Sequence, residues 1–436
     1  MKKIIFFWNE LKASFWFIPV LLIFISIPTA LGFVYLDSTI ESSQEGLLRF
    51  LIVKNPDSAR SILSTISGAM IGVAGTVFSV TLVALTLASS QFGPRLIKNF
   101  MSVKLNQVVL GAYVSTYLYC LLILNSVRES ESSPFIPSVS ILFAILIAVV
   151  NIILLISFIH QIAISIQADK VISDIHEFIS SQVKSLFPEK LGEELELENE
   201  LHPDKAKSKF KNKTGINATK SGYLQYIDSE ALLAMMISNN SLLDLKIKPG
   251  DFIVKGAEIG NLYQNNEMNK EISNELHNQF IIGKTRTSQQ DFEFSIHQMV
   301  EIAARALSPG VNDPYTAIAC IDNLTATMSY LALVRFPSKY RFDDEKNLRV
   351  IANTLSFEGV LDAAFNQIRQ FSAGSPAVTI RLMEALITIR QFTKGGRNEK
   401  AILRHVKMVT NLGKQSMSEE NDFKDLLERS KEIGGG

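Results

Sequence analysis

Four long stretches of the sequence contain no Asp, Glu, Lys or Arg, and they limit what the chain can fold into more than any other feature. These stretches are residues 13–36, 61–92, 105–127 and 132–168. Each exceeds the roughly 20 apolar residues that cross the core of a bilayer. One charge at mid-membrane costs about 2.5–3.5 kcal/mol, so gaps of this length are informative. We predict four transmembrane helices, near residues 14–36, 61–89, 105–127 and 139–163.

A cleaved signal peptide is the alternative interpretation of the first stretch. Signal peptides have a short apolar core followed by a small-x-small cleavage site. The apolar part of residues 13–36 is too long, and no such site follows a short core. An inserted helix is therefore the better interpretation.

The overall composition excludes several classes of protein. Lys plus Arg and Asp plus Glu both number 43, so the formal net charge is zero, and only 20% of the residues are charged. Soluble domains are nearer one-quarter charged. Neutrality argues against a strongly basic nucleic-acid binder and an acidic disordered chain, and we predict no nucleic-acid partner. The two cysteines, Cys120 and Cys320, are too few for a disulfide framework or a cysteine-rich metal site.

The distribution of Lys and Arg predicts the orientation in the membrane. Positive side chains concentrate in cytoplasmic loops. Lys2, Lys3 and Lys12 precede the first predicted helix, and the loop near residues 93–104 carries three more cations. The loop of residues 128–138 has one Arg against two Glu, whereas the first loop is ambiguous. We predict that both termini are cytoplasmic.

Small and hydroxyl side chains recur along the second predicted helix. At spacings of three, four or seven they fall on one side of a helix. The face consists of Ser64, Gly68, Gly72, Gly75, Ser79 and Thr86. One interpretation is a helix-packing face, because small-x-x-x-small pairs let backbones approach closely. The alternative is a pore lining in a homo-oligomer. The absence of charge inside the spans argues against a proton-driven pump, but not against a passive pore.

The remaining sequence predicts a cytoplasmic α+β region. Short apolar strands with Pro-Gly-Asp and Lys-Gly turns suggest a small barrel-sandwich-like β module, although the lysine motif of lipoyl or biotinyl carriers is absent. The following residues favour a helical bundle. The predicted domains are a four-helix transmembrane domain (1–163), a helical stalk and charged linker (164–220), the β module (221–265) and a cytoplasmic helical domain (266–433).

A polar stripe on a predicted helix is the candidate metal site. Glu293, His297 and Glu301 recur every four residues and share a face. A carboxylate and an imidazole one turn apart can converge on a divalent metal. Ion pairing on a helix surface explains the same spacing without metal. No other cofactor is predicted.

A second group of residues is a candidate site for a small ion or anionic ligand. We expect Gly310 in a left-handed cap conformation, and Asp313 as the N-cap of a helix that begins at Pro314. Backbone N–H groups at a helix N-terminus favour anions. The candidates are Arg286, Gln290, Asp291, Arg305, Ser308, Asn312 and Asp313. A plain helical hairpin is the alternative, and Asp313 itself opposes an anion. No nucleotide, hydrolase or metalloprotease motif supports an enzyme.

Several strings resemble one bacterial family. They are SGAMIGVAGTVFSVTLVALTLASSQFGPRL (67–96), GYLQYIDS (222–229), PGDFI (249–253), RTSQQDFEFSIHQMVEIAARALSPGVNDPYTAI (286–318) and AAFNQIRQF (363–371). The chain resembles the uncharacterised membrane family known as domain of unknown function 2254 from about residue 10 to about 410. The resemblance implies a bacterial inner-membrane protein with a large cytoplasmic region, and it implies no activity.

Two hypotheses of function remain open. The first is an oligomeric channel-like protein in which the small-residue face packs or lines an axis and the cytoplasmic modules gate it. The second is a membrane-anchored ligand sensor or scaffold without transport activity. An enzyme is the least supported class.

Overall fold

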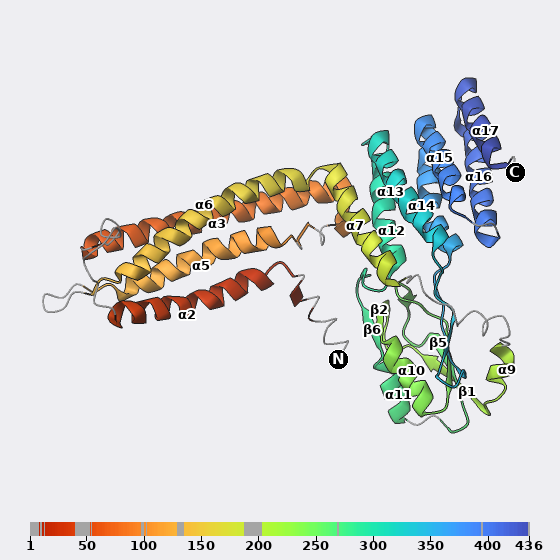
Figure 1. The fold of residues 1–436 in the computed structure, drawn as a ribbon, viewed down its shortest axis with the longest axis horizontal. Coiled ribbons are helices and arrows are strands. Elements are labelled where there is room, and N and C mark those ends of the chain that lie inside the picture. Colours follow the sequence, from red (N-terminus) through yellow and green to blue (C-terminus); the bar gives the residue numbers. More distant parts are fainter. Residues whose placement is uncertain are drawn as a thin grey trace. The chain divides into compact units, whose positions relative to one another are not determined.

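A computed structural model describes residues 8, 11–12, 14–39, 53, 55–96, 100–101, 103–128, 135–186, 203–267, 270–393 and 396–434. The chain divides into two compact units, Met1–Lys170 and Val171–Gly436, which are shown in Figure 1. The acidic run of residues 193–200 lies outside the described residues.

The first unit confirms the four predicted apolar helices. They are α2 (Phe17–Thr39), α3 (Pro56–Phe92), α5 (Lys104–Ser126) and α6 (Ser138–Ser165), and all are long and apolar enough to cross a membrane. Asn55 caps α3 by accepting from the backbone N–H of Asp57, and a 3-10 turn, η2 (Pro94–Leu96), follows Gly93. At 37 residues, α3 is about 55 Å long, more than a bilayer core needs.

Helix α5 makes the most extensive contacts in this unit and packs against α2, α3 and α6. Its glycine Gly111 lies against α2, where an added Cβ would stand 2.8 Å from the Cα of Pro19 and from Cδ1 of Leu22. The two backbones approach this closely only because Gly111 has no side chain. A larger residue at this position would push α2 away from α5.

A buried polar group joins three of the membrane helices. Asn151 of α6 is 1% exposed and its side-chain amide donates to Oγ1 of Thr116 in α5 at 2.9 Å. The same amide lies 3.3 Å from the sulfur of Met70 in α3. The Tyr113 hydroxyl donates to the carbonyl oxygen of Asn151 at 2.7 Å. These bonds satisfy polar atoms that lipid cannot hydrate.

Asp37, at the end of α2, caps α6. Its carboxylate accepts from the backbone N–H of Val139 at 2.8 Å and of Ser140 at 2.9 Å, and from the Ser140 hydroxyl. A helix N-terminus leaves such donors unsatisfied and carries a partial positive charge. Asp37 therefore ties the first span to the last.

The second unit contains two β-sheets. The strands are β1 (Asn212–Asn217), β2 (Gly222–Ile227), β3 (Leu242–Leu245), β4 (Phe252–Ile253), β5 (Glu258–Gln264), β6 (Phe280–Gly283), β7 (Tyr340–Phe342) and β8 (Leu348–Ile351). One sheet has the order β1-β5-β3-β8-β7 and the other β4-β2-β6. All pairs are antiparallel except β3 with β8. Neither sheet closes on itself, so the predicted barrel-sandwich is not confirmed.

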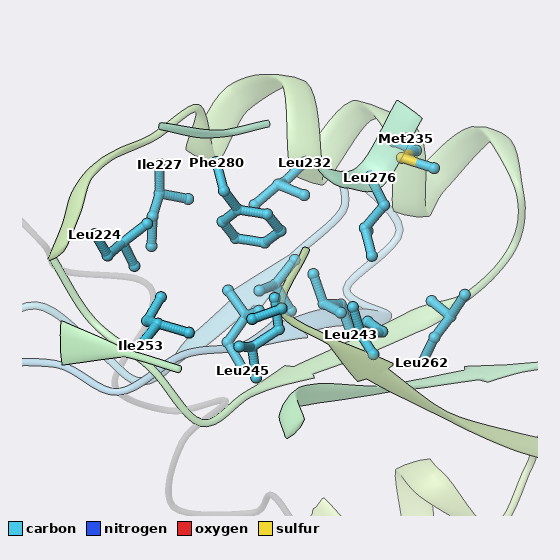
Figure 2. Packing of buried hydrophobic residues seen from close by; sticks show 14 of the residues in the cluster. Leu224, Ile227, Leu232, Met235, Leu243, Leu245, Ile253, Leu262, Leu276 and Phe280 are labelled. Carbon is cyan, nitrogen blue, oxygen red and sulfur yellow. The ribbon is translucent and has the colours of Figure 1, made fainter. Parts of the chain in front are cut away.

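The core of the β module draws on distant parts of the chain (Figure 2). Apolar side chains of both sheets pack against Leu232 and Met235 of α10 (Ser229–Ser238) and Leu276 of α11 (Lys270–His277). Val350 of β8 belongs to the same cluster, because β8 pairs with β3. The sheets thus include strands outside residues 221–265.

Helical hairpins form the rest of the second unit. The helices are α12 (Phe292–Ala306), α13 (Pro314–Leu333), α14 (Phe357–Phe371), α15 (Pro376–Gln391), α16 (Arg397–Ser416) and α17 (Glu420–Gly434), with the 3-10 turn η3 (Ser372–Gly374) after α14. Helices α12, α14 and α16 follow one another in one layer, and α13, α15 and α17 in a second, as Figure 1 shows. We expected a bundle, whereas these hairpins stack side by side, as repeat proteins do.

Two further helices, α7 (Ala168–Leu186) and α9 (Pro203–Lys207), precede the β module in the sequence. Helix α7 packs on α12, since Gln182 donates to the carbonyl oxygen of Ser288 and accepts from the Ser295 hydroxyl. Helix α9 precedes β1, and Lys207 pairs with Asp244 of β3 at 2.8 Å. Part of the segment that we expected to be a charged linker (164–220) thus contacts the β module.

A buried histidine lies between the second and third hairpins. Nε2 of His405 in α16 is 2.7 Å from Oδ1 of Asp362 in α14, and Arg404 also donates to this carboxylate. Burial lowers the pKa of the His405 imidazole, although Asp362 acts in the opposite direction, while the nearby Arg404 and Arg369 add to the lowering. The hydrogen bonds from His405 and Arg404 outweigh burial and lower the pKa of Asp362.

These directions predict that the stack loses stability as pH falls below about 6.5. The unfolded histidine titrates near that pH and the folded one lower, so below about 6.5 the unfolded state binds more protons. The Asp362 carboxyl titrates at a lower pH than the histidine.

Hydrogen–deuterium exchange of α16 amides in the detergent-solubilised chain, corrected for intrinsic rates, should show a several-fold loss of protection from pH 7.5 to 5.5. His405→Gln should remove most of that loss. His160→Gln, at an exposed position in α6, is the control and should keep it; equal behaviour of both variants would contradict the assignment.

Candidate functional site

The small-residue face of α3 points away from the other membrane helices. Its members Ser64, Gly68, Gly72, Gly75, Ser79 and Thr86 are all exposed in the single chain. The opposite face is buried against the unit through Ala59, Leu63, Ser67, Met70, Ala74, Val77, Thr81, Ala88 and Phe92. An added Cβ at any of the three glycines would meet no atom within 4 Å. The face is therefore not a packing seam within one chain.

The hydroxyl groups along this side of α3 are satisfied by their own helix. Ser79 donates to the carbonyl oxygen of Gly75 at 3.0 Å, and Thr86 donates to that of Leu82 at 2.9 Å. Bonds to the carbonyl four residues earlier allow such side chains to face an apolar environment. The exposed face is thus compatible with lipid or with another helix.

Asp291 is the centre of a second group, which joins the β module to α12. Its side chain is 3% exposed. It caps α12 by accepting from the backbone N–H of Phe294 at 3.0 Å. The Arg286 guanidinium donates to both carboxylate oxygens, from Nε at 2.7 Å and from Nη2 at 2.9 Å. Burial raises the pKa of the Asp291 carboxyl, although Arg286 acts in the opposite direction.

The turn of Pro249, Gly250 and Asp251 closes over Asp291. Gly250 has a φ of +97°, and an added Cβ there would overlap the Asp291 carboxylate. Its backbone N–H donates to the carbonyl oxygen of Leu224 at 2.8 Å, which holds the turn on β2. Two strings that are far apart in the sequence therefore meet at this carboxylate.

Two further contacts join the β module to α12 beside Asp291, and together with the contacts of Asp291 they form the junction between the two. The Gln290 side-chain amide accepts from the backbone N–H of Ile227 at 2.8 Å and donates to its carbonyl oxygen at 3.0 Å, as a strand neighbour would. Lys248 pairs with Glu293 at 2.7 Å. Three of the predicted ligand-binding residues, Arg286, Gln290 and Asp291, thus bond to the protein itself.

The other four predicted ligand-binding residues lie at the opposite end of α12. The Ser308 hydroxyl donates to the carbonyl oxygen of Arg305 at 2.7 Å. Asp313 caps α13, as predicted, by accepting from the backbone N–H of Thr316 at 3.1 Å and from its hydroxyl at 2.6 Å. The hydroxyl bond lowers the pKa of Asp313 more than any other contact. Asn312 has a φ of +50°.

The Ser308–Asp313 turn differs from the sequence prediction for Gly310, and it lies far from the other predicted ligand-binding residues. Gly310 does not take the left-handed conformation, which Asn312 takes instead. Asn is the residue that tolerates this region best after Gly. The 15 residues of α12 place the Ser308–Asp313 turn about 22 Å from Asp291. The seven candidates are not brought together into one site.

The polar stripe of α12 is engaged in contacts with cations. Glu293 pairs with Lys248, and Nδ1 of His297 lies 3.4 Å from Nη1 of Arg286. Within the part of the chain that the structure describes, no three His, Cys, Asp or Glu side chains group closely enough to hold a metal ion. These contacts favour ion pairing for Glu293. Metal binding by Glu293, His297 and Glu301 stays an untested prediction.

Sequence reasoning missed the partners that complete these groups. Lys248 and Gly250 were recognised only as strand and turn residues, and Asp37 was assigned no role. The strings PGDFI and RTSQQD could have drawn attention to this region, because both are among the strings that carry the family resemblance. Their contact across the junction depends on tertiary packing that neither string specifies alone.

Comparisons with known proteins place both units in one family. The family described as predicted membrane protein (DUF2254) matches residues 12–388. A protein of Mycobacterium tuberculosis strain H37Rv, named as uncharacterised, is 30% identical over 372 residues, which cover 84% of this chain and 70% of the relative. A protein of Mycobacterium bovis, also named as uncharacterised, has the same identity and coverage. No solved structure matches the chain.

The junction predicts that Gly250→Ala destabilises the second unit more than Gly256→Ala. Both glycines have positive φ, but an added Cβ at Gly256 meets nothing within 4 Å. Gly256→Ala should therefore cost about 1 kcal/mol of backbone strain, and Gly250→Ala about 1–3 kcal/mol more from overlap with Asp291. Thermal unfolding of the detergent-solubilised chain, followed by near-UV circular dichroism, measures both. Equal melting temperatures would show that Gly250 does not pack on the carboxylate.

Proposed function

Because the chain belongs to the family of predicted membrane proteins DUF2254, we propose that it acts as a homo-oligomeric, channel-like protein of the bacterial inner membrane. In this proposal the small-residue face of α3 meets the same face of other copies. The second unit is cytoplasmic and gates the assembly, with both termini on that side. Lys12, Arg95 and Lys104, which flank the spans, support the orientation through the rule that cytoplasmic loops are positive.

The exposure of the α3 face is the observation that carries the proposal. Gly68, Gly72 and Gly75 leave a shallow surface where a second backbone can approach closely. No atom of the described residues would lie within 4 Å of a Cβ added at these three glycines. Close approach between helices gains van der Waals contact that lipid chains do not provide as well. Other copies of the same chain are present wherever it is made. Closed homo-oligomers are also the commonest assemblies of proteins.

The position of α5 supports a path between copies rather than within one. This helix packs against α2, α3 and α6, and its contacts with α2 and α3 are the most extensive in the unit. A ring of α3 helices with small side chains would instead leave room at the axis of an oligomer. The spans lack charged residues near their centres, which suits passive flow rather than proton coupling.

The alternative function is a membrane-anchored ligand sensor or scaffold without transport activity. The specific observation in its favour is the stack of helical hairpins from α12 to α17. Stacked repeats present extended surfaces that commonly bind other molecules. In this alternative the four spans only anchor the chain, and the α3 face has no role in conduction.

The proposal predicts that Gly72→Leu weakens association between copies at least tenfold, about 1.4 kcal/mol. The leucine would hold the two backbones apart. Gly32→Leu is the matched control, because Gly32 in α2 is also exposed with no atom within 4 Å of an added Cβ. Native mass spectrometry over a series of detergent-to-protein ratios measures the oligomer fraction. A monomeric wild type, or equal loss in both variants, would contradict the proposal.

Flux measurements separate the channel from the sensor. Sealed liposomes that contain the wild-type chain should release small ions faster than empty liposomes, and Gly72→Leu should change that rate at least severalfold while Gly32→Leu leaves it unchanged. An oligomer without conductance under any voltage, osmotic or ligand condition would favour the scaffold.

A further inference from the structure

One face of α16 is positively charged from end to end. At 100° per residue, its five cationic positions fall within an arc of about 100°. The exposed cations are Arg397, Lys400, Arg404, Lys407 and Lys414. The opposite side of the helix packs into the hairpin stack through Ala401, Ile402, His405, Val406, Val409 and Gly413. The one carboxylate of α16, Glu399, points elsewhere and pairs with Arg390 at 2.9 Å.

Four of these five cations make no ion pair with any described residue. Arg404 is the exception, since it pairs with Glu358 at 3.2 Å and with Asp362. Several arginines elsewhere in the stack are paired with carboxylates. Arg381 of α15, for example, bonds to Asp322 of α13 and to Glu384 of its own helix. The unpaired charges of α16 therefore form a net positive surface rather than part of an internal network.

Apolar side chains accompany the cations. Leu403 of α16 and Phe392, just after α15, are each 39% exposed. Three of the four unpaired cations are lysines. The hydrated point charge of a lysine suits a diffuse anionic surface better than one fixed ligand. Basic helices with partly exposed apolar residues are typical of membrane interfaces.

We propose that this basic face of α16 binds the surface of a membrane that contains anionic phospholipid. The cations extend over 18 residues, about 26 Å along the helix, and so could contact several headgroups at once. The four candidate spans hold the chain at a bilayer, which raises the effective concentration of lipid for every other part. Neutral net charge and the lack of a base-stacking surface on this helix make nucleic acid a poorer partner.

The inference is independent of conduction. Helix α16 lies beyond residues 12–388, which the family description matches. The basic face would serve a channel and a scaffold equally, by bringing the helical stack to the lipid surface in response to lipid charge.

Fluorescence quenching in the full-length protein tests the proposal. A fluorophore on Asn411→Cys reports from the basic face, because Asn411 is exposed while Cys120 and Cys320 are buried. The chain is placed in nanodiscs of phosphatidylcholine alone or with 30% phosphatidylglycerol, each with a headgroup-labelled quencher lipid. Quenching should be at least twofold greater in the anionic discs and should return to the neutral value at high salt.

Charge reversal provides the matched comparison. Lys400→Glu, Lys407→Glu and Lys414→Glu together should abolish the difference between the two discs. The same change in charge at the exposed lysines Lys255, Lys424 and Lys431 should preserve it. If the first variant fails to fold, the salt titration of the wild type still decides. Equal quenching in neutral and anionic discs, or an effect that salt does not change, would overturn the proposal and point to an acidic protein as the partner.

Discussion

A bilayer core offers no hydrogen-bonding partner, and several polar groups of the first unit accordingly bond to the protein itself. Charge is absent from the centres of all four spans. The amide of Asn151 is bonded to Thr116, and Asp37 satisfies the donors at the start of α6. Hydroxyl groups on the outer side of α3 bond to their own helix. The same constraint makes the exposed small-residue face of α3 informative. The face is uncharged and its hydroxyl groups bond to their own helix, yet the described residues leave it exposed.

In the second unit a buried carboxylate has the corresponding role. Asp291 caps α12, binds Arg286 through both oxygens and lies under the Gly250 turn. A buried charge is tolerated only when paired and hydrogen-bonded. The junction thus fixes the first helix of the stack to the β module. Since these polar groups are used by the protein, the junction is better suited to transmit a change between module and stack than to hold a free anion.

Much of the first unit could be predicted from the sequence, because absence of charge is a local property that helix length converts directly into spans. The Asp313 cap was predictable for the same reason, since capping involves residues within one turn. The pairing of β8 with β3 was not predictable, because Leu243 and Val350 are over 100 residues apart. The exposure of Gly72 was not predictable either, because it depends on the side of α3 that the other helices cover. The Gly250–Asp291 contact likewise exists only after folding.

The central claim is that α3 faces α3 of another copy, and disulfide cross-linking in native membranes tests it most directly. The native cysteines, Cys120 and Cys320, are buried and provide little background. Gly72→Cys or Ser79→Cys should give a covalent dimer under mild oxidation, whereas Gly32→Cys on α2 should not. No dimer at either α3 position, or equal dimer at Gly32, would contradict the account.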